Sequence, residues 1–414
     1  MKNESKQKQA EIINIGDELL AGHTLNSNAT WMSKTLKDIG VKVIKHLVIA
    51  DEKEAITSAL DQVSQHTDYV FITGGLGPTE DDRTKAVITT YFGGELIFSE
   101  EIYSDVAAFF ARRGRVPSES NKGQAIFPNN ARRIVNTKGT ASGMIFEKNG
   151  IQFYVMPGVP YEMQSMMINT VLPEISSNSA ILSKEYQINT FGLPESEIAD
   201  KIATHIPGIE KTINIGYYPS VRGITIRLSA ADEQMVLKTQ NKIVQMLGTA
   251  VYSLDNKNME EIVVGLCKEK TLIISLAESC TGGLTASMIT DVPGSSKILK
   301  QSYVVYSNDA KIKELGVSED VIKRHGAVSE ETVEAMARGL KNKTGADITI
   351  GISGIAGPDG AVPGKPVGLV YIAVLFKDKL RIRKVNYDRG RTKNKEYAAR
   401  AALNEVRLAI TETE

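Results

Sequence analysis

Cysteine is scarce in this sequence, with only Cys267 and Cys280 among 414 residues. Two thiols are too few for a disulfide framework, and the Lys-rich start lacks the apolar core and cleavage site of a secretion signal. Long apolar runs are missing too: the longest, such as residues 271–277, fall well short of the roughly 20 residues that a bilayer helix needs. We therefore expect a cytoplasmic protein with reduced thiols and no membrane partner.

An excess of either charge is also absent, since Lys plus Arg and Asp plus Glu both number 49. Without a global positive field, the composition gives no support to direct contact with nucleic acid. Histidine is rare, at five residues, and His325 is the only one in the C-terminal third. A Ser-His-Asp triad is therefore disfavoured there.

What the sequence does contain is typical of a multidomain globular chain. Hydrophobic residues make up 42% and charged residues 24% of a chain of 414 residues, which exceeds the roughly 250–300 residues at which one core stops growing. Short β-branched runs alternate with helical patterns, which predicts βαβ units and the α/β fold class. We expect an α/β domain with a parallel sheet at residues 1–173, a small α+β middle or dimerisation domain at 174–255, and a second α/β domain at 256–414.

The element pattern is most regular at a few segments. Strands are expected at residues 10–15, 41–48, 69–73, 186–191, 223–228, 271–276, 303–306, 347–352 and 369–376. Helices are expected at residues 195–205 and 233–247, from residue 282, and up to residue 410 at the end of the chain. The middle segment carries no cluster of catalytic residue types, which favours an architectural role.

A glycine loop, Gly74-Gly75-Leu76-Gly77, follows the apolar strand at 69–73 and leads into the acidic Asp81-Asp82 pair. Such a loop can bring backbone N–H groups up to a phosphate, and carboxylate oxygens are ligands for a divalent cation. An ordinary turn with N-capping acids is the alternative. Its place at the end of a parallel strand, where open α/β sheets bind ligands, favours the binding interpretation.

Two further segments each follow an expected strand: residues 16–20 with residues 26–28, and residues 156–163. Together with the glycine loop, these segments resemble, in order, the competence/damage-inducible protein A (CinA) family. The resemblance implies that residues 1–173 share the fold of molybdopterin-binding proteins and hydrolyse ADP-ribose to AMP and ribose 5-phosphate. It also implies a divalent cation, Mg, Co or Mn, with potassium as an assisting ion.

The same resemblance suggests the residues of this N-terminal site. The cation ligands would be Asp17, Asp81 and Asp82, although spacing leaves open which carboxylate binds metal and which activates water. Residues that would contact ADP-ribose are Asn28, Thr73, Gly74, Gly75, Gly77, Thr79, Pro157, Gly158 and Glu162. For Asn28 and Glu162, a helix-cap or surface role is an equal alternative.

In the C-terminal third, the segments 277–283, 293–296 and 303–311 carry the chemistry. A small-residue turn between a strand and a helix leaves N–H groups free for a phosphate. A serine nucleophile could use a desolvated lysine as its base, and Lys311, with Tyr306 as a helper, is the candidate. The alternative is that the serine and the lysine are both solvated surface residues. Cys280 could be a nucleophile with a lowered pKa, but without a histidine partner we expect it to be a small packing residue.

These C-terminal segments also recur in the CinA C-terminal domain, the nicotinamide mononucleotide (NMN) deamidase, which needs no cofactor. The resemblance implies that Ser296 is the nucleophile, Lys311 its base and Tyr306 its helper. Substrate contacts would come from Ser279, Thr281, Gly282, Ser353, Gly354 and Arg391. The family's GDR motif is altered here, so Arg389 competes with Arg391 as the phosphate ligand.

The leading hypothesis is thus a bifunctional, homodimeric enzyme that deamidates NMN and hydrolyses ADP-ribose. A scaffold protein for competence or the DNA-damage response is a second hypothesis. A third is an N-terminal domain that binds molybdopterin without hydrolysis, which kinship of fold alone cannot establish.

Overall fold

The computed structural model describes residues 7–77, 83–176, 185–230 and 232–412. The chain folds as two compact units, Met1–Lys184 and Glu185–Glu414. The second unit therefore contains both the expected middle segment and the expected C-terminal domain. No described helix is long and apolar enough to cross a membrane.

The first unit is built on a mixed six-stranded sheet in the order β2-β1-β3-β8-β7-β6. Strands β2, β1, β3 and β8 run parallel to one another. Strand β7 pairs antiparallel with β8, and β6 pairs antiparallel with β7, so the expectation of a parallel sheet was wrong at this edge. A two-residue Asn149-Gly150 turn, with positive φ at both residues, folds β7 back onto β8. The strand bounds are Gln9–Ile15 (β1), Lys42–Ile49 (β2), Tyr69–Thr73 (β3), Arg132–Ile134 (β6), Gly143–Lys148 (β7) and Ile151–Met156 (β8).

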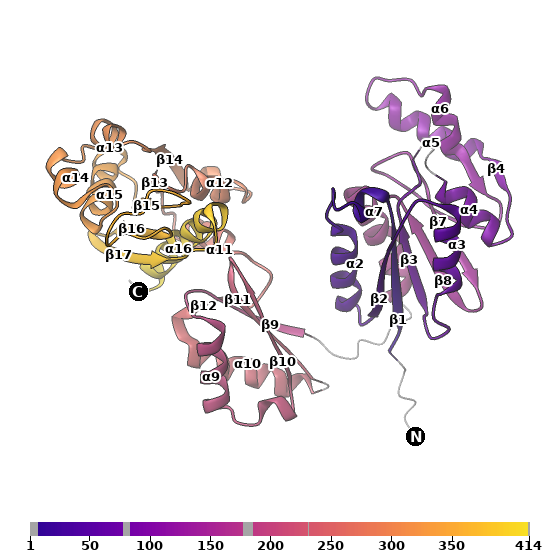
Figure 1. Ribbon diagram of the computed structural model, residues 1–414, viewed down its shortest axis with the longest axis horizontal. Helices are drawn as coiled ribbons and strands as arrows, with labels where there is room; N and C mark the ends of the chain where they lie inside the picture. The colour runs from indigo at the N-terminus through magenta and orange to yellow at the C-terminus, as the bar shows by residue number, and fades with distance from the viewer. Residues whose placement is uncertain (1–6, 78–82, 177–184, 231, 413–414) are drawn as a thin grey trace. The chain divides into compact units, whose positions relative to one another are not determined.

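Helices cover both faces of this sheet, with α2 and α3 on opposite sides (Figure 1). Met32 and Leu36 of α2 pack with Met163 on one face, whereas Ile56 and Ile88 pack on the other. A small ribbon and short helices complete the unit. The bounds are Asp17–Leu20 (α1), Ser27–Asp38 (α2), Lys53–Asp61 (α3), Thr84–Tyr91 (α4), Leu96–Phe98 (β4), Glu100–Ala111 (α5), Glu119–Lys122 (α6), Gly123–Ala125 (η1), Ile126–Pro128 (β5), Pro160–Met166 (α7), Met167–Val171 (η2) and Leu172–Ser176 (α8).

The second unit begins with an antiparallel four-stranded sheet in the order β10-β11-β9-β12. Helices α9 and α10 pack on it through Ile198, Ile202, Val236 and Ile243. Both helices have the bounds predicted from the sequence. The bounds are Glu185–Thr190 (β9), Glu195–His205 (α9), Ile209–Lys211 (η3), Asn214–Ser220 (β10), Gly223–Ser229 (β11), Glu233–Leu247 (α10), Gly248–Ala250 (η4) and Val251–Ser253 (β12).

A buried arginine joins this sheet to the rest of the unit. Arg407 of the last helix donates to the carbonyls of Thr249 and Val251 at 2.5 and 3.2 Å. The rings of Phe191 and Tyr397 stack with centroids 5.2 Å apart. Because these contacts are buried, residues 185–255 and the C-terminal part form one unit.

The C-terminal part contains a five-stranded sheet in the order β14-β13-β15-β16-β17. Strands β14, β13 and β15 run parallel to one another, whereas β16 pairs antiparallel with β15 and β17 pairs antiparallel with β16. Strand β17 was not predicted, although its Lys-Leu-Arg-Ile-Arg run alternates polar and apolar residues. The strand bounds are Ile274–Glu278 (β13), Leu299–Val304 (β14), Ile348–Gly354 (β15), Leu369–Phe376 (β16) and Lys379–Asn386 (β17).

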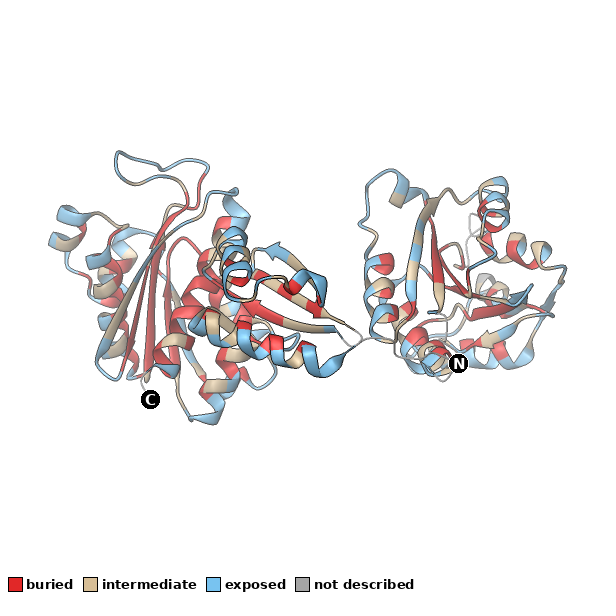
Figure 2. Ribbon diagram, turned by 90° about the horizontal axis from the view of Figure 1, so that it is seen from below, coloured by how far each residue is buried: buried red, intermediate tan, exposed pale blue. Residues whose placement is uncertain are grey.

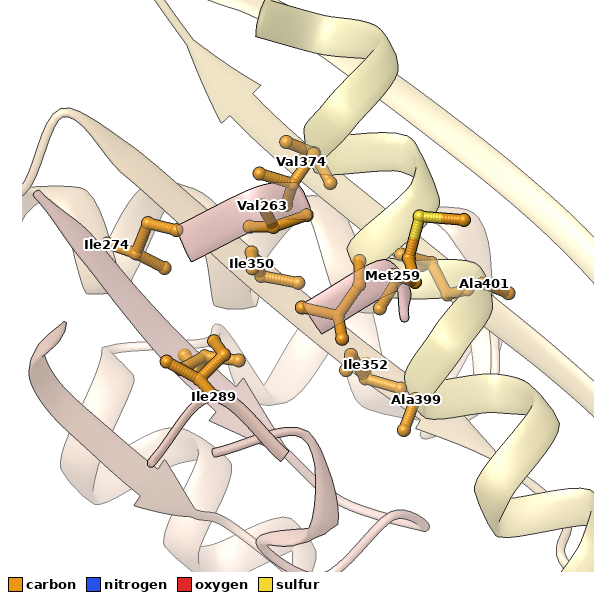
Figure 3. Packing of buried hydrophobic residues seen from close by; sticks show 14 of the residues in the cluster. Met259, Val263, Ile274, Ile289, Ile350, Ile352, Val374, Ala399 and Ala401 are labelled. Atoms are coloured by element: carbon orange, nitrogen blue, oxygen red, sulfur yellow. The ribbon is translucent and has the colours of Figure 1, made fainter. Parts of the chain in front are cut away.

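Helices α11, α12 and α16 pack on one face of this sheet, and α13 and α15 contribute apolar residues to the other. In Figure 3, Val263 of α11 lies by Ile350 and Val374 of the strands, and Met259 of the same helix lies by Ala401 of α16. Figure 2 shows that burial is concentrated in the strands and in the helix faces against them. The bounds are Met259–Glu269 (α11), Leu284–Thr290 (α12), Ser295–Lys297 (η5), Asn308–Leu315 (α13), Glu319–His325 (α14), Glu330–Thr344 (α15) and Arg391–Thr411 (α16).

Candidate active sites

The first unit has a pocket of about 540 Å³ at the carboxyl ends of β1, β3 and β8. The three sequence segments that follow these strands all contribute to it, as the sequence predicted. The predicted contact residues that line it are Asn28, Thr73, Gly74, Gly75, Gly77, Pro157, Gly158 and Glu162. Thr79, Asp81 and Asp82 lie outside the described residues.

Asp17 does not take the place expected of a cation ligand. It is exposed at the start of α1, and its neighbour Glu18 lines the pocket instead. Asp51, which follows β2, is a second lining carboxylate that the sequence analysis missed. It accepts a hydrogen bond from Thr84 Oγ1 at 3.3 Å. Its position after a parallel strand was the available signal.

The glycine loop is needed for packing as well as for access. A side chain at Gly74 would overlap the carbonyl oxygen of Ile15, and one at Gly75 would overlap Thr84 Oγ1. Both residues also have positive φ, which favours glycine. The loop therefore lies tightly against β1 and α4, and close approach to a phosphate is not the only reason for its composition.

Buried amides form the polar wall of this pocket. Asn28 Nδ2 donates to the carbonyl of Gly158 at 2.7 Å, which joins the second and third sequence segments. Asn28 Oδ1 and Gln124 Oε1 are buried without a hydrogen-bond partner among the described residues. An unpaired buried acceptor costs about 1–3 kcal/mol, so a donor from a bound molecule would stabilise this wall. Gln124 was also missed in the sequence, because no motif marks it.

The charge of the pocket is negative. Its described lining includes Glu18, Asp51 and Glu162 but no Lys, Arg or His. An anionic ligand would therefore need a cation of its own. Among the described residues, no group of three or more His, Cys, Asp or Glu is arranged to hold a metal ion. The lining carboxylates are nonetheless hard oxygen donors, which suit a divalent cation.

The second unit has its polar cluster at the carboxyl ends of β13 and β14. Ser279 directly follows β13, and Lys311 lies in the first turn of α13, which follows β14. Ser307 caps this helix by accepting a hydrogen bond from the Ala310 N–H at 3.0 Å. The cap fixes the helix start, and Lys311 Nζ thereby comes within 3.0 Å of Ser279 Oγ. The solvated-surface alternative for Lys311 was wrong, because this side chain is 1% exposed.

The surroundings of the Lys311 amine suit its neutral form. Nζ lies 2.9 Å from the carbonyl of Val305 and 3.4 Å from that of Tyr306. Nζ also donates to Ser279 Oγ at 3.0 Å; in the neutral amine the two N–H groups would suffice for the carbonyls, and the lone pair could accept the proton of the Ser279 hydroxyl. Burial lowers the pKa of Lys311 from its ordinary value of 10.5, against a smaller opposing effect of Cys280. The pair Ser279–Lys311 therefore has the geometry of a nucleophile and its base.

The turn after Ser279 is not a free phosphate site, contrary to expectation. The buried carboxylate of Glu278 accepts hydrogen bonds from the N–H groups of Gly283, Thr285 and Ala286 at 2.9–3.1 Å. The N–H groups of Cys280 and Thr281 donate to no oxygen of the described residues and instead face the Cys280 sulfur, where they lower the pKa of the thiol against the larger effect of burial. Both N–H groups adjoin Ser279 and could hold an oxyanion.

Ser296 does not meet Lys311 in this structure. It lies on η5, before β14, whereas Ser279 and Lys311 lie beyond the opposite ends of the parallel strands. The five residues of β13 separate these edges, a distance of about 13 Å or more at about 3.3 Å per residue. Ser296 is exposed, and no hydrogen bond joins it to any described residue. The expected Ser296–Lys311 pair is therefore wrong within one chain.

The remaining predicted contacts divide into two groups. Arg391 donates to the Tyr306 hydroxyl at 3.3 Å and to the carbonyl of Gly357 at 2.7 Å, which brings both residues to the Lys311 edge. Ser353 instead donates to the carbonyl of Ala327 at 2.6 Å, and a side chain at Gly354 would meet Leu369 O at 2.6 Å. Ser353 and Gly354 are thus explained by packing.

Cys280 is a packing residue in the apolar core of this part of the chain. Burial raises the pKa of its thiol to about 12. The neutral thiol is a weak nucleophile compared with the thiolate. Cys280 therefore does not compete with Ser279 for this role.

Comparisons with known proteins place these sites in a family. Residues 11–177 match the "Probable molybdopterin binding domain", residues 186–253 the "Damage-inducible protein CinA KH domain", and residues 256–410 the "CinA C-terminal domain". A "CinA-like protein" of Chloroherpeton thalassium is 42% identical over 412 residues, which is 96% of this chain and 98% of the relative. The chain belongs to the CinA family.

A second relative of similar length agrees with this membership. A "Putative competence-damage inducible protein" of Caldicellulosiruptor bescii is 37% identical over 407 residues, with 97% of this chain and 99% of the relative covered. Among solved structures, the competence/damage inducible protein CihA from Agrobacterium tumefaciens is 36% identical, with a TM-score of 0.36; the match covers 38% of this chain and 99% of that one. By the family matches, the pocket of the first unit lies in the molybdopterin-binding-like domain of a CinA-family chain, and the Ser279–Lys311 pair lies in the CinA C-terminal domain.

Proposed function

We propose that the C-terminal site is a serine amidase that converts NMN and water to nicotinic acid mononucleotide and ammonia. The observation that carries this proposal is the buried Lys311 amine, 3.0 Å from Ser279 Oγ, with two carbonyls to accept its N–H groups. The resemblance to NMN deamidases suggests the substrate. The distance of 3.0 Å between Lys311 Nζ and Ser279 Oγ supports Ser279, in place of Ser296, as the nucleophile in this proposal.

In this mechanism Ser279 Oγ attacks the amide carbon of NMN while Lys311 Nζ takes the hydroxyl proton. The N–H groups of Cys280 and Thr281 stabilise the oxyanion that forms on the carbonyl oxygen. The Lys311 ammonium then gives its proton to the amide nitrogen, the C–N bond breaks, and ammonia leaves. Lys311 next takes a proton from water, whose oxygen attacks the carbonyl carbon of the Ser279 ester. The bond between this carbon and Ser279 Oγ then breaks, Lys311 returns the proton to Oγ, and the product leaves as a carboxylate after it loses its own proton to solvent.

The test of this proposal is ammonia release from NMN by the purified full-length chain in the presence of a chelator. We expect one ammonia and one nicotinic acid mononucleotide for each NMN consumed, and a loss of both products in Lys311→Met. Equal turnover by this variant would remove Lys311 from the mechanism.

We also propose that the pocket of the first unit hydrolyses ADP-ribose to AMP and ribose 5-phosphate. Its buried acceptors Asn28 Oδ1 and Gln124 Oε1 suit hydroxyl or amino donors of a nucleotide. A divalent cation held by Glu18 and Asp51 would supply positive charge to the phosphoryl oxygens of the substrate. The resemblance adds Asp81 and Asp82 to this set.

Molybdopterin binding without hydrolysis is a second candidate for this pocket, because the family match of residues 11–177 names such a domain. Product analysis with ADP-ribose and a divalent cation distinguishes the two. AMP and ribose 5-phosphate in equal amounts support hydrolysis. Binding of a pterin without ADP-ribose turnover supports the second candidate.

A further inference from the structure

A cavity of about 440 Å³ lies inside the second unit, where the four-stranded sheet meets the C-terminal part. Ligand pockets measure about 300–1,000 Å³ and are frequent at junctions between domains. Different residues line this cavity and the amidase site, so the proposed deamidation does not explain it. Its lining comes from the segment after β9, the turn η4, strand β17 and the end of α16: Phe191, Gly192, Leu193, Thr249, Ala250, Arg381, Ile382, Arg383, Asn404, Glu405, Leu408 and Glu412.

An amide nitrogen without a partner faces this cavity. Asn404 lines the cavity and is only 7% exposed. Its Oδ1 accepts hydrogen bonds from Arg407 Nε and Nη2 at 3.2 and 2.8 Å, which fixes the orientation of the amide. Nδ2, on the other branch, donates to no described residue. Because a buried N–H group without an acceptor is unfavourable, an acceptor from a bound molecule would stabilise this wall.

The next residue of α16 presents a carboxylate oxygen that is also left open. Glu405 lines the same cavity and is likewise 7% exposed. Its Oε2 accepts one long hydrogen bond, from Arg381 Nε at 3.4 Å. Its Oε1 lies 3.9 Å from Arg383 Nε, which is too far for a hydrogen bond. A carboxylate has about four acceptor positions, so Glu405 can accept further hydrogen bonds from a cationic ligand.

The charges of the lining match a ligand that carries both signs. The guanidinium groups of Arg381 and Arg383 are balanced by the carboxylates of Glu405 and Glu412. Arg381 is already occupied, since its Nη1 donates to Glu412 at 2.6 Å, whereas Arg383 is exposed and donates to no described residue. A simple anion would leave the Glu405 oxygen unpaired. A simple cation would leave Asn404 Nδ2 and Arg383 unpaired.

We propose that this cavity binds a zwitterionic α-amino acid with an apolar side chain. The ligand carboxylate accepts hydrogen bonds from Arg383 and Asn404 Nδ2, and the ligand ammonium donates to Glu405 Oε1. The site is independent of the proposed amidase, and its ligand stabilises the junction because it contacts both parts of the unit. The ligand side chain packs against the apolar part of the lining, which is Phe191, Leu193, Ala250, Ile382 and Leu408.

The first test measures binding of L-leucine, L-methionine and L-phenylalanine to the full-length chain by calorimetry and thermal unfolding. At least one of them should bind with a Kd below about 1 mM and raise the unfolding temperature. The amide and the 2-oxo acid of the amino acid that binds most tightly each lack one of its two charges. Each should bind about tenfold to a hundredfold more weakly, because one charge-assisted contact is lost.

The second test compares Arg383→Met with Lys384→Met. Lys384 is the next residue of β17, and its side chain lies on the other face of the sheet, over the Tyr371 ring. Arg383→Met should weaken binding of the amino acid about tenfold to a hundredfold, and the Lys384→Met control should leave the Kd unchanged. Glu405→Gln keeps an acceptor but loses the charge, so the preference for the amino acid over its 2-oxo acid should fall about tenfold. A purely structural role of Glu405 would leave that preference unchanged.

Three results would overturn the proposal. They are no binding of any of the three amino acids, equal affinity in wild type and Arg383→Met, and tighter binding of the 2-oxo acid than of the amino acid by the wild type. The last result would identify a simple anion site. If Glu405→Gln does not fold, the comparison of Arg383→Met with Lys384→Met still decides.

Discussion

Replacing each of two serines with alanine tests the reassignment of the nucleophile. Ser279→Ala removes the oxygen that lies 3.0 Å from Lys311 Nζ. Loss of a covalent nucleophile lowers kcat by about four to six orders of magnitude. At about 1.36 kcal/mol per factor of ten, the activation barrier should rise by about 5–8 kcal/mol.

The same change should have a small effect on stability. It removes one hydrogen bond of a buried amine that keeps two carbonyl partners, and such a bond contributes about 1 kcal/mol to the free energy of unfolding. A large loss of rate with a small shift in thermal unfolding would therefore show a chemical effect. Ammonia release from NMN and circular dichroism on heating measure the two quantities.

Ser296→Ala is the matched control in the same domain. Its hydroxyl is exposed, and no described residue hydrogen bonds to it, so we expect less than about 0.5 kcal/mol change in stability and near-normal turnover. The combination of Ser279→Ala with Lys311→Met should be little worse than either change alone, because a nucleophile and its base act as a unit. Near-normal turnover of Ser279→Ala, with a severe loss in Ser296→Ala, would refute the reasoning.

The remaining predictions concern protons, metal and the thiol. Only the neutral amine is a base, and burial lowers the pKa of Lys311 below 10.5. The value of kcat/KM for NMN should therefore rise with pH through that lowered pKa and then reach a plateau. A value of kcat/KM that falls over the same pH range would contradict the role of Lys311 as the base. A chelator should stop ADP-ribose hydrolysis and leave ammonia release intact, and chelator-sensitive deamidation would argue against a Ser–Lys mechanism. Cys280→Ala should keep most of the NMN turnover, because the pKa of the thiol is raised to about 12; its complete loss in a folded variant would return Cys280 to the candidates.

Local patterns predicted the elements well where one face of each is buried. The helices Glu195–His205 and Glu233–Leu247 and the strand Tyr69–Thr73 have the predicted bounds. The antiparallel strands β6, β7 and β17 were missed. Periodicity does not give the direction of a strand, but the Asn149-Gly150 pair was an available signal for a hairpin.

The position of the candidate nucleophile could have been inferred from the order of the elements. Ser279 follows a parallel strand, and the carboxyl ends of such strands are the usual ligand edge. Ser296 precedes the next strand, which puts it at the other edge. The role of Glu278 could not be predicted, because its hydrogen bonds to the N–H groups of Gly283, Thr285 and Ala286 depend on the geometry of the turn.

The most direct test of the central claim is to locate the acyl group on the protein. Purified chain is mixed with NMN, quenched with acid during the first turnover, and digested for peptide mass mapping. We predict the added mass of the nicotinoyl nucleotide as an ester on the peptide that contains Ser279. An ester on Ser296 or Cys280, or a burst of ammonia with no ester on the Ser279 peptide, would contradict the account.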